Sequence, residues 1–166
     1  EIAEALGRSE AACRKLLSRA RVHLEERRDA QPAPAERQLA VASAFFQALG
    51  SGDLNQVVKL LADDVATTTD HGGKVSAAQN SLLGPDRVAR FFLGLFGKAR
   101  QAPFQVAWES AYVNGAPALI VKVAGAVQNA IVLRITGQAE AARVSHIHVV
   151  RNPDKLAAIQ AGATLA

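Results

Sequence analysis

The chain has 166 residues, enough for one domain or for a small appendage beside one. With 49% hydrophobic and 20% charged residues it has the composition of a globular protein, and no apolar run approaches the roughly 20 residues that span a bilayer. The single cysteine, Cys13, excludes an intramolecular disulfide and fits a reducing cytosol, so we expect a cytoplasmic protein without a membrane partner. The absence of methionine and the start at Glu1 are expected of part of a longer protein.

Positive charge is concentrated near the N-terminus. Residues 8–28 contain seven basic and three acidic side chains, a net charge of +4, whereas the chain from Asp29 onward contains twelve basic and ten acidic side chains, a net charge of +2. A basic segment of this kind indicates nucleic acid or an acidic surface as partner, and a solvated helix face is the alternative interpretation.

Residues 1–24 are predicted to form a helix-turn-helix. Gly7 ends a short first helix, and Ser9 can cap a second one. Apolar side chains follow the helical period along one stripe of the second helix, and basic side chains lie outside that stripe. The stripe consists of Cys13, Leu17, Ala20 and Leu24, and the polar face carries Arg14, Lys15, Ser18, Arg19 and Arg21. Two short helices joined by a glycine-containing turn, the second one basic, describe this DNA-binding motif.

A charged and proline-rich stretch, residues 25–35, is predicted to be a linker to a second domain at 36–166. That domain begins with a helix over residues 36–49 that ends at Gly50. A second helix follows a cap at Asp53, and a third starts near Pro85. The side chains predicted to face inward are Leu39, Ala42, Phe46 and Leu49, then Leu54, Val57, Val58 and Leu61, then Val88, Phe91, Phe92 and Leu95.

Strand patterns dominate after Pro103. Residues 104–112 alternate, with Phe104, Val106, Trp108, Ser110 and Tyr112 on one face, and Asn114-Gly115 is a strong hairpin signal. Further strands are predicted at 65–69, 118–123, 130–136 and 143–151, and a last short helix at 154–159. Helices followed by antiparallel strands predict an α+β domain, in which a curved antiparallel sheet packs on helices around a conical cavity.

The first 24 residues resemble the end of region four of bacterial sigma factors. The segments that carry the resemblance are Glu1–Gly7, Arg8–Glu10 and Arg14–Arg21. The resemblance implies that the second helix enters the major groove of the upstream promoter element and that DNA is contacted by Arg14, Lys15, Ser18 and Arg19. The parts of a sigma factor that bind core RNA polymerase are absent from this chain. We therefore expect polymerase to be a partner of the full-length protein, and this fragment not to initiate transcription alone.

Two short motifs resemble the SnoaL-like extension of one group of extracytoplasmic-function (ECF) sigma factors. Asp70-His71-Gly72-Gly73-Lys74 is similar to that group's Asp-Gly-Gly-Gly-Lys loop, with His71 replacing the first glycine, and Asn152-Pro153-Asp154-Lys155-Leu156 matches its C-terminal signature. In that group the extension is not an enzyme; it contacts the sigma core and acts like a fused anti-sigma factor. The resemblance implies a SnoaL-like cone and a regulatory contact made by Asp70, Gly72, Gly73, Lys74, Asn152, Pro153, Asp154, Lys155 and Leu156. A loop that needs positive φ at the first glycine would be strained by His71.

Both motifs also have a local explanation. Asn152 can cap a helix whose first position is Pro153 and whose dipole is favoured by Asp154. The segment 70–74 can be a simple turn. In the functional interpretation, by contrast, Lys74 points at an acidic partner segment.

His146 and His148 lie two apart on a predicted strand and therefore share one face. With Asp70 they could bind a metal, or they could act as general bases in a cyclase-like pocket. We favour a third interpretation, in which both histidines line a wet cavity or face solvent. Trp108 is expected in the core or in the lining of that cavity. We predict no metal, no cofactor and no enzymatic activity. The alternative functions are a small cyclase, isomerase or hydrolase, and a sensor whose cavity binds a small apolar ligand.

Overall fold

The computed structural model of the protein describes residues 9, 11–18, 32–75 and 81–161. The chain divides into two compact units, Glu1–Gln31 and Pro32–Ala166, and each is described by itself. Much of the predicted helix-turn-helix lies outside the described residues, including its first helix, Gly7, Arg19, Ala20, Arg21 and Leu24. The assignment of residues 1–24 to a separate DNA-reading unit therefore stays a prediction.

Residues 11–18 of the first unit are helical. The predicted cap at Ser9 is confirmed, because its Oγ accepts a hydrogen bond from the backbone N–H of Ala12 at 3.2 Å and its carbonyl oxygen accepts one from Cys13 at 3.0 Å. Leu17, a member of the predicted apolar stripe, is 53% exposed. Within the described part of the unit, the stripe is therefore not fully covered.

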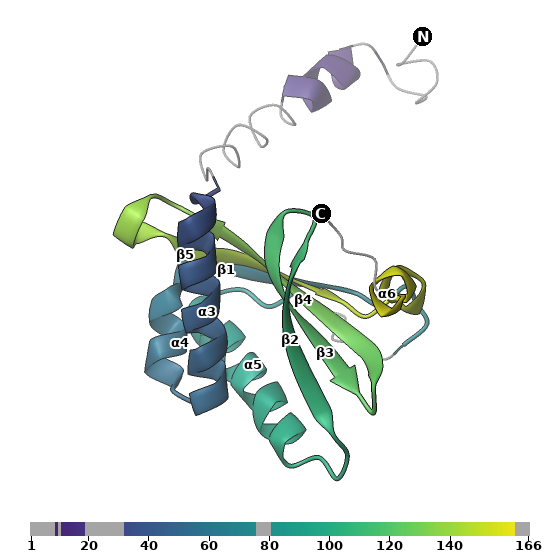
Figure 1. The fold of residues 1–166 in the computed structure, drawn as a ribbon. Coiled ribbons are helices and arrows are strands. Elements are labelled where there is room, and N and C mark those ends of the chain that lie inside the picture. Colours follow the sequence, from purple (N-terminus) through teal and green to yellow (C-terminus); the bar gives the residue numbers. More distant parts are fainter. Residues whose placement is uncertain (1–8, 10, 19–31, 76–80, 162–166) are drawn as a thin grey trace. The chain divides into compact units, whose positions relative to one another are not determined.

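In the residues that the structure describes, the second unit has four α-helices and a five-stranded sheet (Figure 1). Its helices are α3 (Ala35–Ser51), α4 (Leu54–Leu60), α5 (Pro85–Arg100) and α6 (Pro153–Gln160), with a 3-10 turn, η1, at Ala139–Ala141. Its strands are β1 (Leu61–Asp70), β2 (Val106–Val113), β3 (Ala116–Val123), β4 (Ala126–Thr136) and β5 (Arg143–Val150). Within the described ranges, no helix combines the length and the apolarity that crossing a membrane requires.

The strand order is β1-β5-β4-β3-β2. The β2–β3, β3–β4 and β4–β5 pairs are antiparallel, as predicted. The edge strand β1 instead runs parallel to β5, from Ala66 beside His146 to Asp70 beside Val150. The α+β class is thus confirmed. The sheet is mixed, because β1, which lies between α4 and α5 in the chain, pairs in parallel with the last strand, β5.

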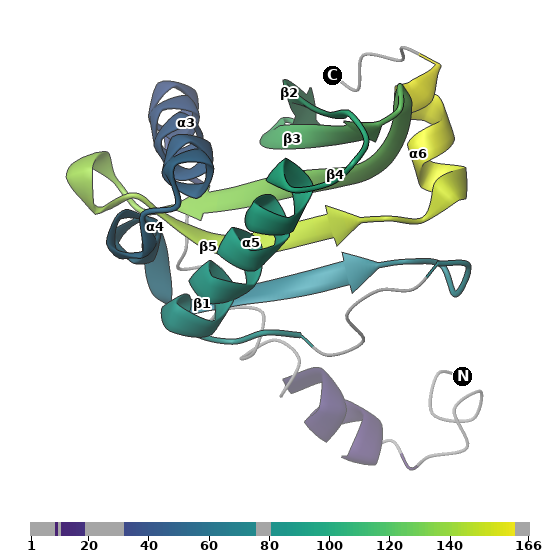
Figure 2. The same ribbon diagram turned by 90° about the horizontal axis from the view of Figure 1, so that it is seen from below.

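Each face of the sheet carries its own apolar cluster. Helices α3, α4 and α5 cover one face, where Phe45, Phe92 and Leu133 are fully buried. Helix α6 lies apart from them (Figure 2), and its Leu156 packs with Ile120 and neighbouring side chains that point from the sheet in the opposite direction. The alternation of side chains along each strand produces these two layers.

Irregular pairing allows the sheet to curve toward the three helices. The register shifts between Val121 and Lys122 in the β3–β4 pair, and between Arg134 and Ile135 in the β4–β5 pair. Such bulges bend a strand and increase its twist. Phe96 and Trp108 pack in the interior that results, and their ring centroids lie 4.3 Å apart.

Most of the local signals are confirmed. Asp53 caps α4 by accepting a hydrogen bond from the N–H of Gln56 at 3.0 Å, and Pro85 occupies the first position of α5. Asn114 and Gly115 have φ values of 52° and 72°, as a two-residue hairpin with positive φ at both positions requires. Phe104, predicted to lie in a strand, precedes β2 and is 52% exposed.

Two helix predictions are wrong in detail. Helix α3 continues past Gly50 and ends at Ser51, and its C-cap, Gly52, adopts the left-handed conformation at φ 81°. Leu39 and Leu95, predicted to face inward, are 51% and 42% exposed. In α5 the buried positions are Val88, Ala89, Phe92 and Phe96. Leu95 lies at the edge of that stripe, because each residue turns the helix by about 100°.

The predicted linker overlaps the second unit. Ala33 is buried, its N–H donates to the carbonyl of Ile135 at 3.0 Å, and Pro32 bridges to Thr136. Arg37, in the first turn of α3, pairs with Glu140 at 2.9 Å. The residues just before α3 are therefore attached to the end of β4 rather than forming part of a loose connection.

Candidate functional site

The two sequence motifs meet at one edge of the sheet. Asp70 is the last residue of β1, and Asn152 follows β5 and caps α6. The backbone N–H groups of Arg151 and Asn152 both donate to the carbonyl oxygen of Asp70, at 2.7 and 3.0 Å. Because β1 and β5 are parallel, their carboxyl ends lie together, and so do the segments that follow them. We call the surface formed by residues 70–74 and 152–155 the motif surface.

Two crossed ion pairs join the segments of the motif surface. Nζ of Lys74 lies 2.5 Å from a carboxylate oxygen of Asp154, and Nζ of Lys155 lies 2.6 Å from one of Asp70. The hydrogen bond from Lys155 is the main cause that lowers the pKa of the Asp70 carboxyl below its ordinary value, and the N–H of Gly72 adds to it. All four side chains are at least 36% exposed, so screening by water keeps the contribution of the pairs to stability small.

Tight backbone packing holds the loop at residues 70–74. The N–H groups of Gly72 and Gly73 donate to Asp70 Oδ1 and His71 Nδ1, both at 3.1 Å. Gly72 has φ 59°, and a Cβ built on it would lie 2.6 Å from the side-chain amide of Asn152. The close approach of Asn152 thus explains a glycine at position 72.

Replacement of the motif's first glycine by His71 does not strain the loop. Among the described non-glycine residues, positive φ occurs at Asn114, Ala124 and Ala139 and not at His71. The imidazole instead accepts the hydrogen bond from Gly73 described above.

The local explanation of the C-terminal signature is confirmed. Asn152 Oδ1 accepts a hydrogen bond from the N–H of Asp154 at 3.1 Å, Pro153 is the first residue of α6, and Leu156 is buried. The charged groups of Asp154 and Lys155 remain largely exposed beside Lys74. A regulatory contact of this surface with another part of a longer protein stays a prediction.

The two histidines do not line the interior of the cone, contrary to one of our predictions. They alternate along β5 with Ile147 and Val149, which belong to the core beneath the helices, and therefore point away from it. Their rings stack 4.2 Å apart, and Oγ1 of Thr68 lies 3.2 Å from Nε2 of His146 and 2.9 Å from Nδ1 of His148.

This placement removes the basis for an acid–base site in the cavity. Asp70, the third member of the candidate set, is engaged by Lys155 at the motif surface. In the parts of the chain that the structure describes, three or more His, Cys, Asp or Glu side chains are nowhere grouped to hold a metal ion.

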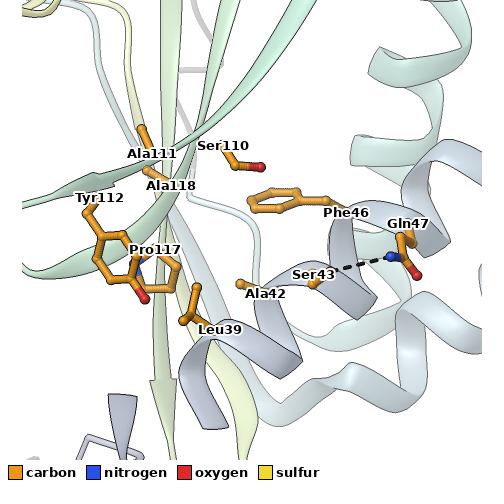
Figure 3. Close-up of a pocket in the computed structure, with 10 residues that line it drawn as sticks. All are labelled: Leu39, Ala42, Ser43, Phe46, Gln47, Ser110, Ala111, Tyr112, Pro117 and Ala118. Atoms are coloured by element: carbon orange, nitrogen blue, oxygen red, sulfur yellow. Dashed lines mark hydrogen bonds between the residues drawn. The ribbon is translucent and has the colours of Figure 1, made fainter. Parts of the chain in front are cut away.

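A pocket of about 530 Å³ opens between α3 and the β2–β3 hairpin (Figure 3). Its lining residues are Leu39, Ala42, Ser43, Phe46, Gln47, Ser110, Ala111, Tyr112, Pro117 and Ala118. Trp108, predicted as a cavity residue, is not among them and packs on Phe96 instead. Sequence patterns missed this pocket, because they place Leu39 and Tyr112 in the core, whereas both are partly exposed at its wall.

The candidate DNA-contacting side chains lie on the helix at 11–18. Arg14, Lys15 and Ser18 are exposed, and Ser18 lies one turn beyond Arg14, so the three share one side of the helix. Arg19 lies outside the described residues.

No protein-family model matches the chain. It is 42% identical over 120 residues to the ECF RNA polymerase sigma factor SigJ of Mycobacterium tuberculosis H37Rv, covering 69% of this chain and 37% of SigJ. It is also 30% identical over 162 residues to the probable ECF sigma factor SigI of M. tuberculosis CDC 1551, covering 97% of this chain and 51% of SigI. This chain is a homologue of the ECF sigma factors. It spans about half, or less, of the length of these curated relatives.

The crystal structure of M. tuberculosis SigJ matches 99% of this chain and 55% of its own chain, with a TM-score of 0.57 and 30% identity. The predicted SnoaL-like cone is confirmed by this match. A protein of unknown function with a cystatin-like fold from Methylobium petroleophilum PM1 shares the fold alone, at a TM-score of 0.50 and 7% identity over 72% of this chain and 78% of its own. The homologues are sigma factors, which are not enzymes, in agreement with the prediction that this chain is not one.

Substitution of Gly72 by alanine tests the packing of the motif surface. We expect Gly72→Ala to lower the free energy of unfolding by about 1–3 kcal/mol more than Gly73→Ala, because both residues have positive φ but only position 72 faces Asn152 at 2.6 Å. Urea unfolding of the chain followed by circular dichroism measures both losses. Equal losses would show that Asn152 moves aside at no cost.

Proposed function

We propose that this chain is the promoter-reading and regulatory end of an ECF sigma factor that acts in the cytoplasm with core RNA polymerase. The helix that includes residues 11–18 binds the upstream promoter element, and the SnoaL-like domain regulates the sigma factor through contacts with its core. The observation that carries this proposal is the assembly of two distant motifs into one exposed surface, in a homologue of ECF sigma factors.

DNA binding is supported by the chemistry of the exposed helix side. Arg14 and Lys15 can donate hydrogen bonds to phosphates or to guanine edges, and the Ser18 hydroxyl can reach either. Arg19 follows directly in the sequence and extends the same basic segment. The exposed Leu17 is an apolar side chain on this helix that can pack on another part of the sigma factor.

Alanine substitutions in the full-length protein test the helix. We expect Arg14→Ala and Lys15→Ala to weaken promoter binding by the holoenzyme. If the replaced residue contacts a phosphate, the slope of log K against log salt concentration should also decrease in magnitude by about one. Fluorescence anisotropy with promoter DNA at several salt concentrations measures both effects. Lys98→Ala, on the exposed side of α5, is the matched control. Promoter affinity unchanged in the Arg14 and Lys15 variants would refute the assignment.

Regulation is supported by the rigidity of the motif surface. Residues 70–74 and 152–155 are held by backbone hydrogen bonds and by the close contact of Gly72 with Asn152. A surface ordered in advance loses little conformational entropy when it binds. Leu156 contributes indirectly, because its buried side chain packs α6 on the sheet. The proposed contact residues are Asp70, Gly72, Gly73, Lys74, Asn152, Pro153, Asp154, Lys155 and Leu156.

Removal of the cone tests the regulatory half. We expect the full-length protein cut after Gln31 to give more promoter-dependent transcript than the intact protein, because an inhibitory contact with the sigma core is lost. Run-off transcription with purified core polymerase measures the yield, and a second protein that ends before Asn152 shows whether α6 and its cap are needed. Identical yields from all three proteins would leave the cone without a regulatory role.

The pocket between α3 and the hairpin favours a second candidate function, that of a small-ligand sensor. The pocket has no Asp, Glu, Lys, Arg or His in its lining, and its volume lies within the usual range for ligand sites. An uncharged, mainly apolar molecule with one or two hydrogen-bonding groups fits this lining. Such a ligand acts on the sigma factor only if its affinity differs between two conformations of the protein.

Filling the pocket tests this candidate. We expect the uncharged dye N-phenyl-1-naphthylamine to gain fluorescence with the unaltered chain and with Gln128→Phe, which is exposed on β4 outside the pocket. Ser110→Phe should abolish the gain, because its ring occupies the space beside Phe46 (Figure 3). Equal fluorescence with both variants, or no gain with the unaltered chain, would count against the pocket as a ligand site.

A further inference from the structure

We propose that Thr68, His146 and His148 form a pH-sensitive switch that joins the edge strand β1 to β5 at neutral pH and releases it in mild acid. The three side chains lie on the outer face of the sheet, which α3, α4 and α5 do not cover. We call His146 and His148 the histidine pair. The inference concerns the fold of the cone and does not depend on the proposed function.

One hydroxyl group serves both members of the histidine pair. Oγ1 of Thr68 lies 3.2 Å from Nε2 of His146 and 2.9 Å from Nδ1 of His148. A hydroxyl donates one proton and accepts others, so both hydrogen bonds form when one ring nitrogen carries a proton and the other does not. When both rings are charged, both nitrogens are donors. The hydroxyl proton must then turn away from the pair.

A second positive charge on the pair is also unfavourable electrostatically. The ring centroids lie 4.2 Å apart, so two imidazolium rings would repel each other. Arg134 pairs with His146 across β4 and β5 and adds a further positive charge. Partial burial, followed by the charge of Arg134, lowers the pKa of His148 below its ordinary value.

The acidic groups on β1 offset this charge only in part. Asp70, two residues beyond Thr68, is already engaged by Lys155 of α6. Asp64 is exposed in the irregular first part of the strand, two residues before the position that pairs with His146. At the start of β5, Arg143 donates to the backbone carbonyls of Glu140 and Ala142. The charged group that most affects His148 is therefore Arg134.

Strand β1 is the element that this charge can displace. It lies at the edge of the sheet, whereas β5 is held on its other side by β4 (Figure 2). Along its free edge, β1 is joined to residues 82–84 by backbone hydrogen bonds at Val65 and Thr67. Separation of residues 66–70 from β5 would remove Thr68 from the histidine pair and let water solvate both rings.

The direction of the pH dependence follows from the lowered pKa of His148. The folded protein binds fewer protons than the unfolded protein where this group titrates. The stabilisation is complete above about pH 6.5, the ordinary pKa of imidazole, and is lost as the pH falls toward the lowered value.

Thermal unfolding between about pH 7.5 and 5.5 tests the switch, because histidines titrate in this range while most carboxylates stay ionised. We expect the Tm of the unaltered chain to fall by about 3–5 °C more than that of His148→Gln or Arg134→Gln. His71→Gln, which removes an imidazole outside the pair, is the matched control and should behave as the unaltered chain does. Equal falls in the unaltered chain and in both test variants would overturn the proposal.

Hydrogen exchange shows whether β1 is the part that opens. We expect exchange of the amides at 66–70, corrected for the intrinsic effect of pH, to rise about threefold or more at the lower pH relative to the β2–β3 hairpin. His148→Gln should abolish this rise. An equal rise in β1 and in the hairpin would indicate a general loss of stability and reject the switch. If His148→Gln does not fold, Arg134→Gln decides by the same two measurements, because its side chain is exposed.

Discussion

Strand β1 pairs in parallel with β5, and the motif surface depends on this pairing. Parallel strands end at the same edge of a sheet, so the segments that leave Asp70 and Val150 emerge side by side. One carbonyl group, that of Asp70, then accepts two hydrogen bonds from the turn into α6. An antiparallel edge strand would carry residues 71–74 to the opposite end of the sheet, and Lys74 could not reach Asp154, 80 residues further along the chain.

The pocket and the motif surface lie in different parts of the cone. Beneath α5, Phe96 stacks on Trp108, and both side chains belong to the apolar cluster that the helices cover. The pocket of about 530 Å³ lies between α3 and the β2–β3 hairpin. The motif surface lies at the start of α6, which packs on the opposite face of the sheet. A ligand and a protein partner would thus use different layers of the same domain.

Pro32 and Ala33 are attached to the end of β4. The connection between the two units therefore ends at Pro32. Ala33 is buried and hydrogen-bonded to Ile135, and Arg37 is paired with Glu140 one turn into α3. A segment held by a ladder hydrogen bond and by burial on the cone does not behave as a flexible tether.

Local chemistry in the sequence was sufficient to predict the caps at Ser9, Asp53 and Asn152, the Asn114-Gly115 hairpin and the α+β class. These features depend on neighbours within a few residues, and their physical causes are readable in order along the chain. The parallel β1–β5 pair, the crossed ion pairs, the outward histidines and the rim pocket all depend on which distant strand or helix becomes a neighbour. Only the tertiary structure decides this, because periodicity shows that His146 and His148 share a face but not which face the helices cover.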